Sequence, residues 1–268
     1  MTCFNRKEKT EKCIKSLEKK NSGINFSFVV VDDNSKDGTF DMLKELSNSY
    51  DIHILRGNGK LYYSAGMRTG MEYIKNSTII DYDYLLMVND DVAFYEGCVE
   101  LLLQQSIEKG NSVIVGATCD KSGNLSYGAI KYIGKGLRYR TLSILESNIS
   151  CDTFNANCVL IPKRWFINSD IIDSHYRHSL GDFDYGLSLR KCGCNLYTSN
   201  FYVGMCNNNS SEKTWGNSNL SIKERLKLKE SVKGAPFRPW FYFLKKNFGI
   251  VYALIYSFTP YIRICLKR

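Results

Sequence analysis

Two pairs of adjacent carboxylates, Asp32–Asp33 and Asp90–Asp91, directly follow short apolar runs of this sequence. Neighbouring carboxylates repel each other unless a cation balances them, and a divalent ion bridging a carboxylate to a diphosphate would do so. Such an ion would also offset charge that develops on a departing diphosphate. The pair at 90–91 is therefore a candidate metal site, although acid pairs at strand ends also form turns and helix N-caps.

Asp33 indicates a second kind of contact. A carboxylate at the open edge of a sheet can accept the imide N–H of a uracil or thymine ring, which would select pyrimidine nucleotides. The alternative is that Asp33 only caps the helix that follows. Arg68 lies in a predicted helix after the turn at 57–59, and it either pairs with a diphosphate in bidentate fashion or remains a solvated helix arginine.

Asp182 and Asp184 lie at alternate positions where another helix is predicted to begin. An acceptor hydroxyl is a poor nucleophile until a base removes its proton, and one of these acids is a candidate for that base. Acids also stabilise helix N-termini through the helix dipole, so a structural role is an equal alternative. The histidines His53, His175 and His178 lack metal-ligand spacing and are interpreted as structural or surface groups.

The elements that must position these acids alternate between strand and helix. Predicted strands cover residues 26–31, 52–55, 84–88 and 112–117, and predicted helices cover 8–19, 39–46, 65–74 and 98–107. Alternation of this kind predicts a doubly wound α/β sheet. Ligands of such sheets bind at the carboxyl ends of the strands, so both acidic pairs are expected to share one crevice.

Composition limits the class of protein. The 268 residues are 44% hydrophobic, enough for one sizeable core, and 36 Lys and Arg against 27 Asp and Glu give a net charge of +9. This balance suits an anionic partner, but the basic residues are scattered without a nucleic-acid module, so no nucleic acid is expected. The ten cysteines lack zinc-ribbon spacing and follow no signal peptide, which favours the cytoplasm.

Residues 220–268 are expected to form a helical tail rich in aromatic and basic residues, appended to a catalytic domain at 1–219. The tail contains no apolar run of about 18 residues, so a conventional membrane span is not predicted. Aromatic rings mixed with Lys and Arg are typical of segments in the headgroup region. Two alternatives remain open: the tail lies on the inner face of the plasma membrane, or it packs on the domain or on a second copy in a homodimer.

Five motifs together resemble the family 2 glycosyltransferases, an inverting family with the GT-A fold. They are Thr2-Cys-Phe-Asn-Arg, Val30-Val-Asp-Asp-Asn-Ser-Lys-Asp-Gly-Thr, Val88-Asn-Asp-Asp-Val, Asn155-Ala-Asn-Cys-Val-Leu-Ile-Pro and Gly181-Asp-Phe-Asp-Tyr-Gly-Leu-Ser-Leu-Arg-Lys-Cys-Gly. They occur in the family's order and cover nearly the whole chain. The resemblance implies an α/β, Rossmann-like GT-A fold with a mixed sheet flanked by helices.

The resemblance also implies contacts with a nucleotide-sugar donor. Thr2 and Asp33 would hold the nucleotide base, and Asp90 would bind the ribose or the metal shell. Asn58 and Arg68 complete the predicted donor contacts.

The chemistry follows from the same resemblance. Asp91 would bind Mg²⁺ or Mn²⁺ as the last acid of a DxD-type motif, and Asp182 would correspond to the catalytic base. The implied reaction is a single displacement at the anomeric carbon, with a nucleoside diphosphate as the leaving group.

Three departures from the family pattern are visible. The DxD position begins with Asn89, a poorer ligand than Asp. A later loop carries Asn208 where many relatives have a histidine; its carbonyl can still coordinate, with lower metal affinity. Only Met1 precedes Thr2, where relatives have an apolar strand, so we expect a truncated first strand and a native start upstream.

The sequence therefore predicts an inverting glycosyltransferase that moves a hexosyl- or rhamnosyl-type sugar from a UDP- or dTDP-sugar. Its acceptor would be a glycan or lipid-linked saccharide in bacterial cell-surface polysaccharide synthesis. A non-catalytic glycosyltransferase-like subunit is the alternative favoured by the Asn-rich loop and the missing strand. A nucleotidyltransferase is disfavoured because residues 2–10 contain no glycine for a phosphate loop.

Overall fold

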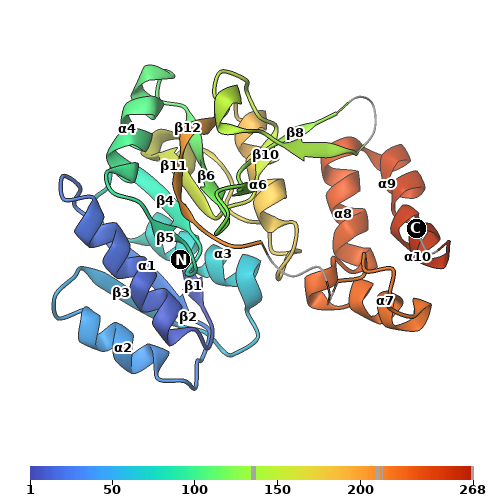
Figure 1. Cartoon of the computed structure of the whole chain (residues 1–268), viewed down its shortest axis with the longest axis horizontal. Coiled ribbons are helices and arrows are strands. Elements are labelled where there is room, and N and C mark those ends of the chain that lie inside the picture. Colours follow the sequence, from blue (N-terminus) through green and yellow to red (C-terminus); the bar gives the residue numbers. More distant parts are fainter. Residues whose placement is uncertain (134–136, 209–211, 213, 267–268) are drawn as a thin grey trace.

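A computed structural model describes residues 1–133, 137–208, 212 and 214–266, and it has helices covering strands on one body with a helical appendage (Figure 1). A parallel sheet of order β1-β2-β3 forms the N-terminal part. Its strands are β1 (Thr2–Cys3), β2 (Phe28–Asp32) and β3 (Ile52–Arg56), and its helices are α1 (Lys7–Lys20), α2 (Thr39–Leu46) and α3 (Tyr62–Asn76). All five residues of β2 are buried, as its run of apolar residues predicts.

A mixed sheet of order β4-β11-β6-β12-β5, with β7 beside β6, forms the rest of the body. Its strands are β4 (Tyr84–Val88), β5 (Ala93–Phe94), β6 (Val113–Cys119), β7 (Leu125–Tyr127), β11 (Cys158–Pro162) and β12 (Leu196–Met205). The helices that follow strands here are α4 (Cys98–Glu108), α5 (Lys163–Asn168) and α6 (Gly181–Lys191). Strand β11 runs antiparallel to both β4 and β6, whereas β12 runs parallel to β6.

A small antiparallel sheet of order β10-β8-β9 adjoins this body. It consists of β8 (Ala129–Tyr132), β9 (Tyr139–Thr141) and β10 (Thr153–Phe154). The expected α/β fold with a mixed sheet flanked by helices, the GT-A arrangement, is thus confirmed. The prediction of one doubly wound sheet was too simple, because the described strands pair in separate sets and β11 reverses direction.

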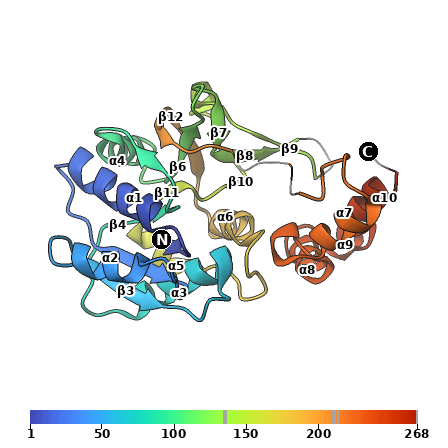
Figure 2. The same ribbon diagram turned by 60° about the horizontal axis from the view of Figure 1, so that its bottom comes forward.

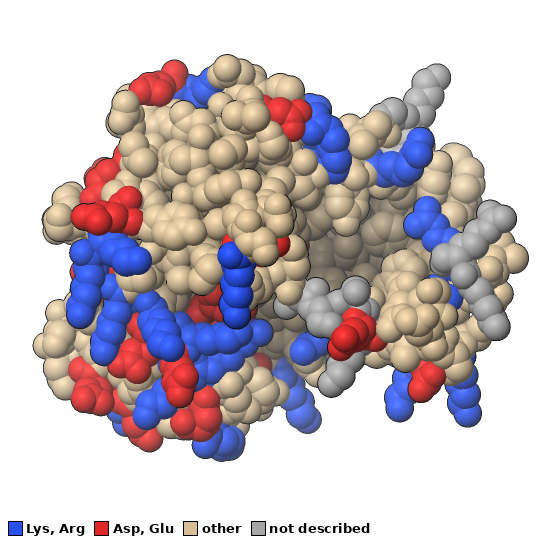
Figure 3. Space-filling view, in the orientation of Figure 1, with Lys and Arg blue, Asp and Glu red and all other residues tan. Residues whose placement is uncertain are grey.

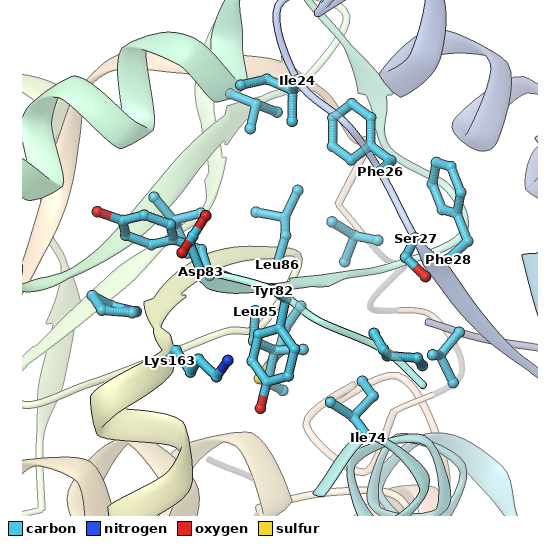
Figure 4. Close-up of a pocket in the computed structure, with 18 of the residues that line it drawn as sticks. Ile24, Phe26, Ser27, Phe28, Ile74, Tyr82, Asp83, Leu85, Leu86 and Lys163 are labelled. Atoms are coloured by element: carbon cyan, nitrogen blue, oxygen red, sulfur yellow. The ribbon is translucent and has the colours of Figure 1, made fainter. Parts of the chain in front are cut away.

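The first strand is short, and a cavity lies beside it. The α-ammonium group of Met1 donates a hydrogen bond to the Val29 carbonyl at 2.9 Å, and burial lowers its pKa. Next to it lies a cavity of about 800 Å³ lined by residues from β2 and β4. Figure 4 shows Phe26 and Phe28 across this cavity from Leu85 and Leu86. None of the predicted site residues lines it.

The C-terminal helices gather beside the body, next to α6, in both ribbon views (Figures 1 and 2). They are α7 (Ile222–Lys229), α8 (Phe237–Phe248), α9 (Ile250–Tyr256) and α10 (Thr259–Cys265). Helix α8 attaches to the body through Lys246, which contacts Asp173 at 2.8 Å and Asp184 at 2.6 Å. Part of the tail therefore packs on the domain, one of the two arrangements expected from the sequence.

The outer helices of the tail carry exposed apolar side chains. Val251, Leu254 and Ile255 of α9 are 62%, 57% and 59% exposed, and Ile262 of α10 is 53% exposed. Within the described residues, no helix combines the length and apolar character needed to cross a bilayer. We call Val251, Leu254, Ile255 and Ile262 the apolar face of the tail.

Candidate active site

Asp33 organises the loop that leads into α3. Its Oδ1 accepts the N–H of Gly59 at 2.7 Å, and its Oδ2 accepts the N–H groups of Leu61 and Tyr62 at 2.8 and 3.2 Å. The loop approaches so closely that a Cβ on Gly57 would lie 2.5 Å from Asp33 Oδ1. A carboxylate has about four lone-pair positions, so these three bonds leave about one for a nucleotide base.

Thr2 lies beneath the same helix. Its hydroxyl donates to the Val31 carbonyl at 3.2 Å, and a Cβ on Gly66 of α3 would lie 2.3 Å from its Oγ1. This close approach requires a glycine at position 66. Thr2 is therefore beside the start of α3, where the resemblance implies a nucleotide contact.

The two remaining predicted donor contacts flank this region. Asn58 is exposed, and its side-chain carbonyl accepts the N–H of Lys60 at 2.9 Å. Arg68 is 21% exposed; its guanidinium contacts the Asp173 carbonyl at 3.4 Å and Glu72 at 3.7 Å. Arg68 must exchange these long contacts in order to reach a diphosphate.

The acid pair at 90–91 lies directly beyond the end of β4. The Asp90 and Asp91 side chains are 5% and 20% exposed, and Nη1 of Arg6 reaches them at 2.8 and 3.0 Å. Burial raises the pKa of Asp90, while the charge of Arg6 opposes that rise. The repulsion expected between the two carboxylates is thus balanced by an arginine from the start of α1.

The oxygen donors at this pair suit a hard divalent cation such as Mg²⁺ or Mn²⁺. Besides the two carboxylates, the Oδ1 of Asn89 is buried without a hydrogen-bond partner among the described residues. No group of three or more His, Cys, Asp or Glu side chains in the described part of the chain could hold a metal. A cation here would take its other ligands from a diphosphate and water, as Mg²⁺ usually does.

The loop with the second predicted metal residue starts beside the pair. Cys206, directly after β12, donates from Sγ to Asp91 Oδ1 at 3.7 Å. Asn208 lies two residues further along and is exposed. The structure therefore brings the beginning of this loop to Asp91, and metal coordination by Asn208 stays a prediction.

Asp182 lies in the first turn of α6. Its oxygens accept the N–H of Phe183 at 2.9 Å and the N–H of Ala156 at 3.3 Å. Burial raises the pKa of Asp182 to about 6, and these backbone N–H groups oppose the rise. Such a carboxylate is ionised at neutral pH, and its pKa is close enough to neutral pH for it to act as a general base.

Asp184, the other candidate base, is occupied. Its side chain is 2% exposed, with one oxygen 2.6 Å from Lys246 Nζ and the other accepting from Asn247 Nδ2 at 2.7 Å. Both partners come from α8. Asp184 therefore fastens the tail to α6, and Asp182 stays the candidate base.

Tyr63 connects the acids. Burial raises its pKa, and the charges of Asp182 and Asp91 raise it further. The hydroxyl donates to the carbonyl of Ala156, whose N–H is bonded to Asp182. Tyr63 also directly follows Tyr62, whose N–H is bound by Asp33. The first turn of α3 thus contacts Asp33 directly and Asp182 through Ala156.

A second link runs through the segment before β11. Asn157, next to Ala156, donates from Nδ2 to Cys206 Sγ at 3.5 Å, and Cys206 donates in turn to Asp91. The Asn157 carbonyl also accepts the N–H of Asn89 at 3.1 Å.

In the space-filling view the surface is hollowed between the body and the C-terminal helices (Figure 3).

Comparison with known proteins agrees with this geometry. The family model described as glycosyl transferase family 2 matches residues 1–166. This chain belongs to that family.

A dolichol-phosphate mannosyltransferase of Pyrococcus furiosus is 24% identical to this chain over 122 residues, 46% of its length. That match spans 33% of the length of the relative. The matched family region includes the acids at 33, 90 and 91 and ends before Asp182. The assignment of Asp182 as the candidate base therefore rests on the motif at 181–193 and on its contacts with Ala156 and Phe183.

Sequence reasoning missed two residues that contact the region of the predicted acids. Arg6 was the last residue of a recognised motif, and that position was the available signal. Tyr63 gave no signal, because its contact with Ala156 depends on tertiary structure. His178, interpreted as structural, packs edge-on against Tyr62, and its pKa falls to about 4 because of burial and then the charges of Lys233 and Arg6.

Proposed function

We propose that this chain transfers a hexosyl- or rhamnosyl-type sugar from a UDP- or dTDP-sugar to a glycan or lipid-linked acceptor, inverting the anomeric centre. The observation that carries the proposal is the chain of contacts between the two acids: the Ala156 N–H bonds to Asp182, the adjacent Asn157 donates to Cys206, and Cys206 donates to Asp91. A donor diphosphate bound at Asp91 would then have its sugar between the acid pair and the base. That arrangement suits a single displacement.

Each part of the site has a role in this reaction. Asp33 and Thr2 shape the pocket for the pyrimidine, and Asp90 and Asp91 hold Mg²⁺ or Mn²⁺ together with the diphosphate. The bound cation would supply charge that stabilises the leaving diphosphate. Asp182 accepts the proton of the acceptor hydroxyl as that oxygen attacks.

The apolar face of the tail supports a lipid-linked acceptor in bacterial cell-surface polysaccharide synthesis. Val251, Leu254 and Ile255 follow helical spacing and project from one side of α9. Exposed apolar side chains beside basic residues suit the boundary between headgroups and acyl chains. The protein would then act peripherally, on the cytoplasmic face of the membrane.

The proposal is tested with a panel of UDP- and dTDP-sugars in the presence of Mn²⁺, with release of nucleoside diphosphate as the readout. One donor class should be consumed, and Asp182→Asn should slow its consumption by about 100-fold or more. The surface variant Asp170→Asn serves as the control. Consumption of no nucleotide sugar, together with no binding of UDP, would contradict the proposal.

A further inference from the structure

Arg6 occupies the space between the two acids of the pair. A single nitrogen, Nη1, lies 2.8 Å from Asp90 Oδ1 and 3.0 Å from Asp91 Oδ2. A divalent ion binds carboxylate oxygens at about 2.1 Å, so an ion shared by these two oxygens would fall within contact distance of that nitrogen. Two cations at that separation repel strongly in a partly buried site. Arg6 and a divalent ion therefore cannot bind these two oxygens at the same time.

The backbone of Arg6 is fixed, whereas its side chain has room to move. The preceding Asn5 adopts a positive φ of 51° and donates its N–H to Ser35 Oγ at 2.9 Å. The Asn5 side chain accepts the N–H of Lys36 at 2.7 Å, and the Arg6 carbonyl accepts the N–H of Thr10, in the first turn of α1, at 3.0 Å. The Arg6 side chain itself is 44% exposed. Its guanidinium can thus leave the pair without any change in the fold.

We propose that Arg6 is the resident counter-ion of Asp90 and Asp91, displaced from the pair when a divalent cation binds with a nucleoside diphosphate. The released guanidinium pairs with the diphosphate, since a planar fork of donors matches phosphate oxygens. The buried Asp90 is then neutralised both before and after the exchange. This inference rests on the proposed function, because it takes the diphosphate as the ligand.

The exchange couples the two ligands. Without nucleotide, a cation must displace Arg6 and leave its guanidinium without an anion, so metal binding is weakened. With nucleotide, the diphosphate accepts the guanidinium and the metal binds more tightly. Reciprocity requires that the metal strengthen nucleotide binding by the same factor.

The test measures Mn²⁺ binding from the electron paramagnetic resonance signal of the free ion. Arg6→Met, which removes the charge and keeps the length, should bind Mn²⁺ roughly tenfold more tightly in the absence of nucleotide, the factor expected for one lost charge-assisted bond. With Mn²⁺ present, UDP should bind Arg6→Met roughly tenfold more weakly than wild type. Adding Asp91→Asn to Arg6→Met should abolish the gain in Mn²⁺ affinity.

Arg140→Met is the matched control. Arg140 also pairs with a carboxylate, that of Glu146, and its side chain is 45% exposed, close to the value for Arg6. It should leave both affinities unchanged. If Arg6→Met does not melt cooperatively, Arg6→Gln carries the same prediction, because it is also neutral.

The outcomes separate this inference from the proposed function. Unchanged or weaker Mn²⁺ binding by a folded neutral variant at position 6 overturns the counter-ion role, even where wild type binds UDP with Mn²⁺. Tighter Mn²⁺ binding by the variant, with no binding of UDP or dTDP by wild type, supports the counter-ion role and overturns the proposed donor.

Discussion

Replacing Asp182 by Asn should remove a pH-dependent loss of stability together with the proposed base. Burial raises the pKa of Asp182 from the ordinary value of 3.8 to about 6. Below pH 3.8 the carboxyl is protonated in both the folded and the unfolded chain. As the pH rises toward 6, the unfolded chain releases this proton while the folded chain keeps it, so the folded state loses stability.

Each pKa unit corresponds to about 1.4 kcal/mol, so the complete loss is about 3 kcal/mol. The Asp182 side chain is partly exposed, and some of this stability is already lost at pH 4. The loss of stability between pH 4 and pH 7.5 is therefore about 2 kcal/mol. Asparagine does not titrate. The free energy of unfolding of Asp182→Asn, relative to wild type, should therefore rise by about 2 kcal/mol over this range.

The assay is urea unfolding followed by tryptophan fluorescence at several pH values between 4 and 7.5. Asparagine also places an NH₂ group near a backbone N–H that donates to Asp182 in the wild type. This changes the free energy of unfolding by an amount that does not depend on pH. The pH-dependent part is the diagnostic quantity. The exposed-acid variant Asp170→Asn should show none of it, and a difference between Asp182→Asn and wild type that stays constant with pH would refute the reasoning.

Three further perturbations test other parts of the account. Lys246→Met removes the cation that pairs with the buried carboxylate of Asp184 and should lower the free energy of unfolding, measured with urea, by about 3 kcal/mol. The control Lys245→Met, at the exposed neighbouring position, should change it by less than about 0.5 kcal/mol. Equal effects would argue against the attachment of α8. Leu254→Ser should weaken flotation with anionic vesicles, and Ile79→Ser, which removes an apolar side chain that is 74% exposed on the body, should not; equal flotation of both would exclude the apolar face as the membrane contact. A short extension of β-branched residues ahead of Met1 should fill the cavity between β2 and β4 and raise the melting temperature by roughly 4 °C or more. The same rise with a Gly-Ser extension of equal length would contradict this.

Much of the fold could be predicted because local patterns encode it. The helix at 39–46 and the strand at 84–88 have the bounds that their periodicity predicts. The direction of β11 could not be predicted, because a buried strand shows the same apolar run whether it pairs parallel or antiparallel. Helix α3 begins at Tyr62, before the predicted Ala65, because Asp33 binds the backbone of its first turn.

The sequence indicated the candidate acids but not their partners. Asp33, Asp91 and Asp182 were selected because they lie in motifs that resemble the family, and their roles stay predictions. Arg6 pairs with an acid 84 positions away, and local patterns do not encode such long-range contacts. The position of Asp182 and Asp184 at the start of a helix did not distinguish them, whereas the resemblance favoured Asp182; the contacts of Asp184 with α8 agree with that choice.

The account depends on Asp33, Asp91 and Asp182 bordering one cavity that holds a cation and a diphosphate. Carbon-13 NMR of aspartate-labelled protein tests this most directly. With UDP bound, Mn²⁺ should broaden the carboxyl signals of all three acids, while Asp81, which precedes β4 at its opposite end, should stay sharp. Broadening at Asp91 with an unaffected Asp182 signal would place the proposed base outside the site and contradict the account.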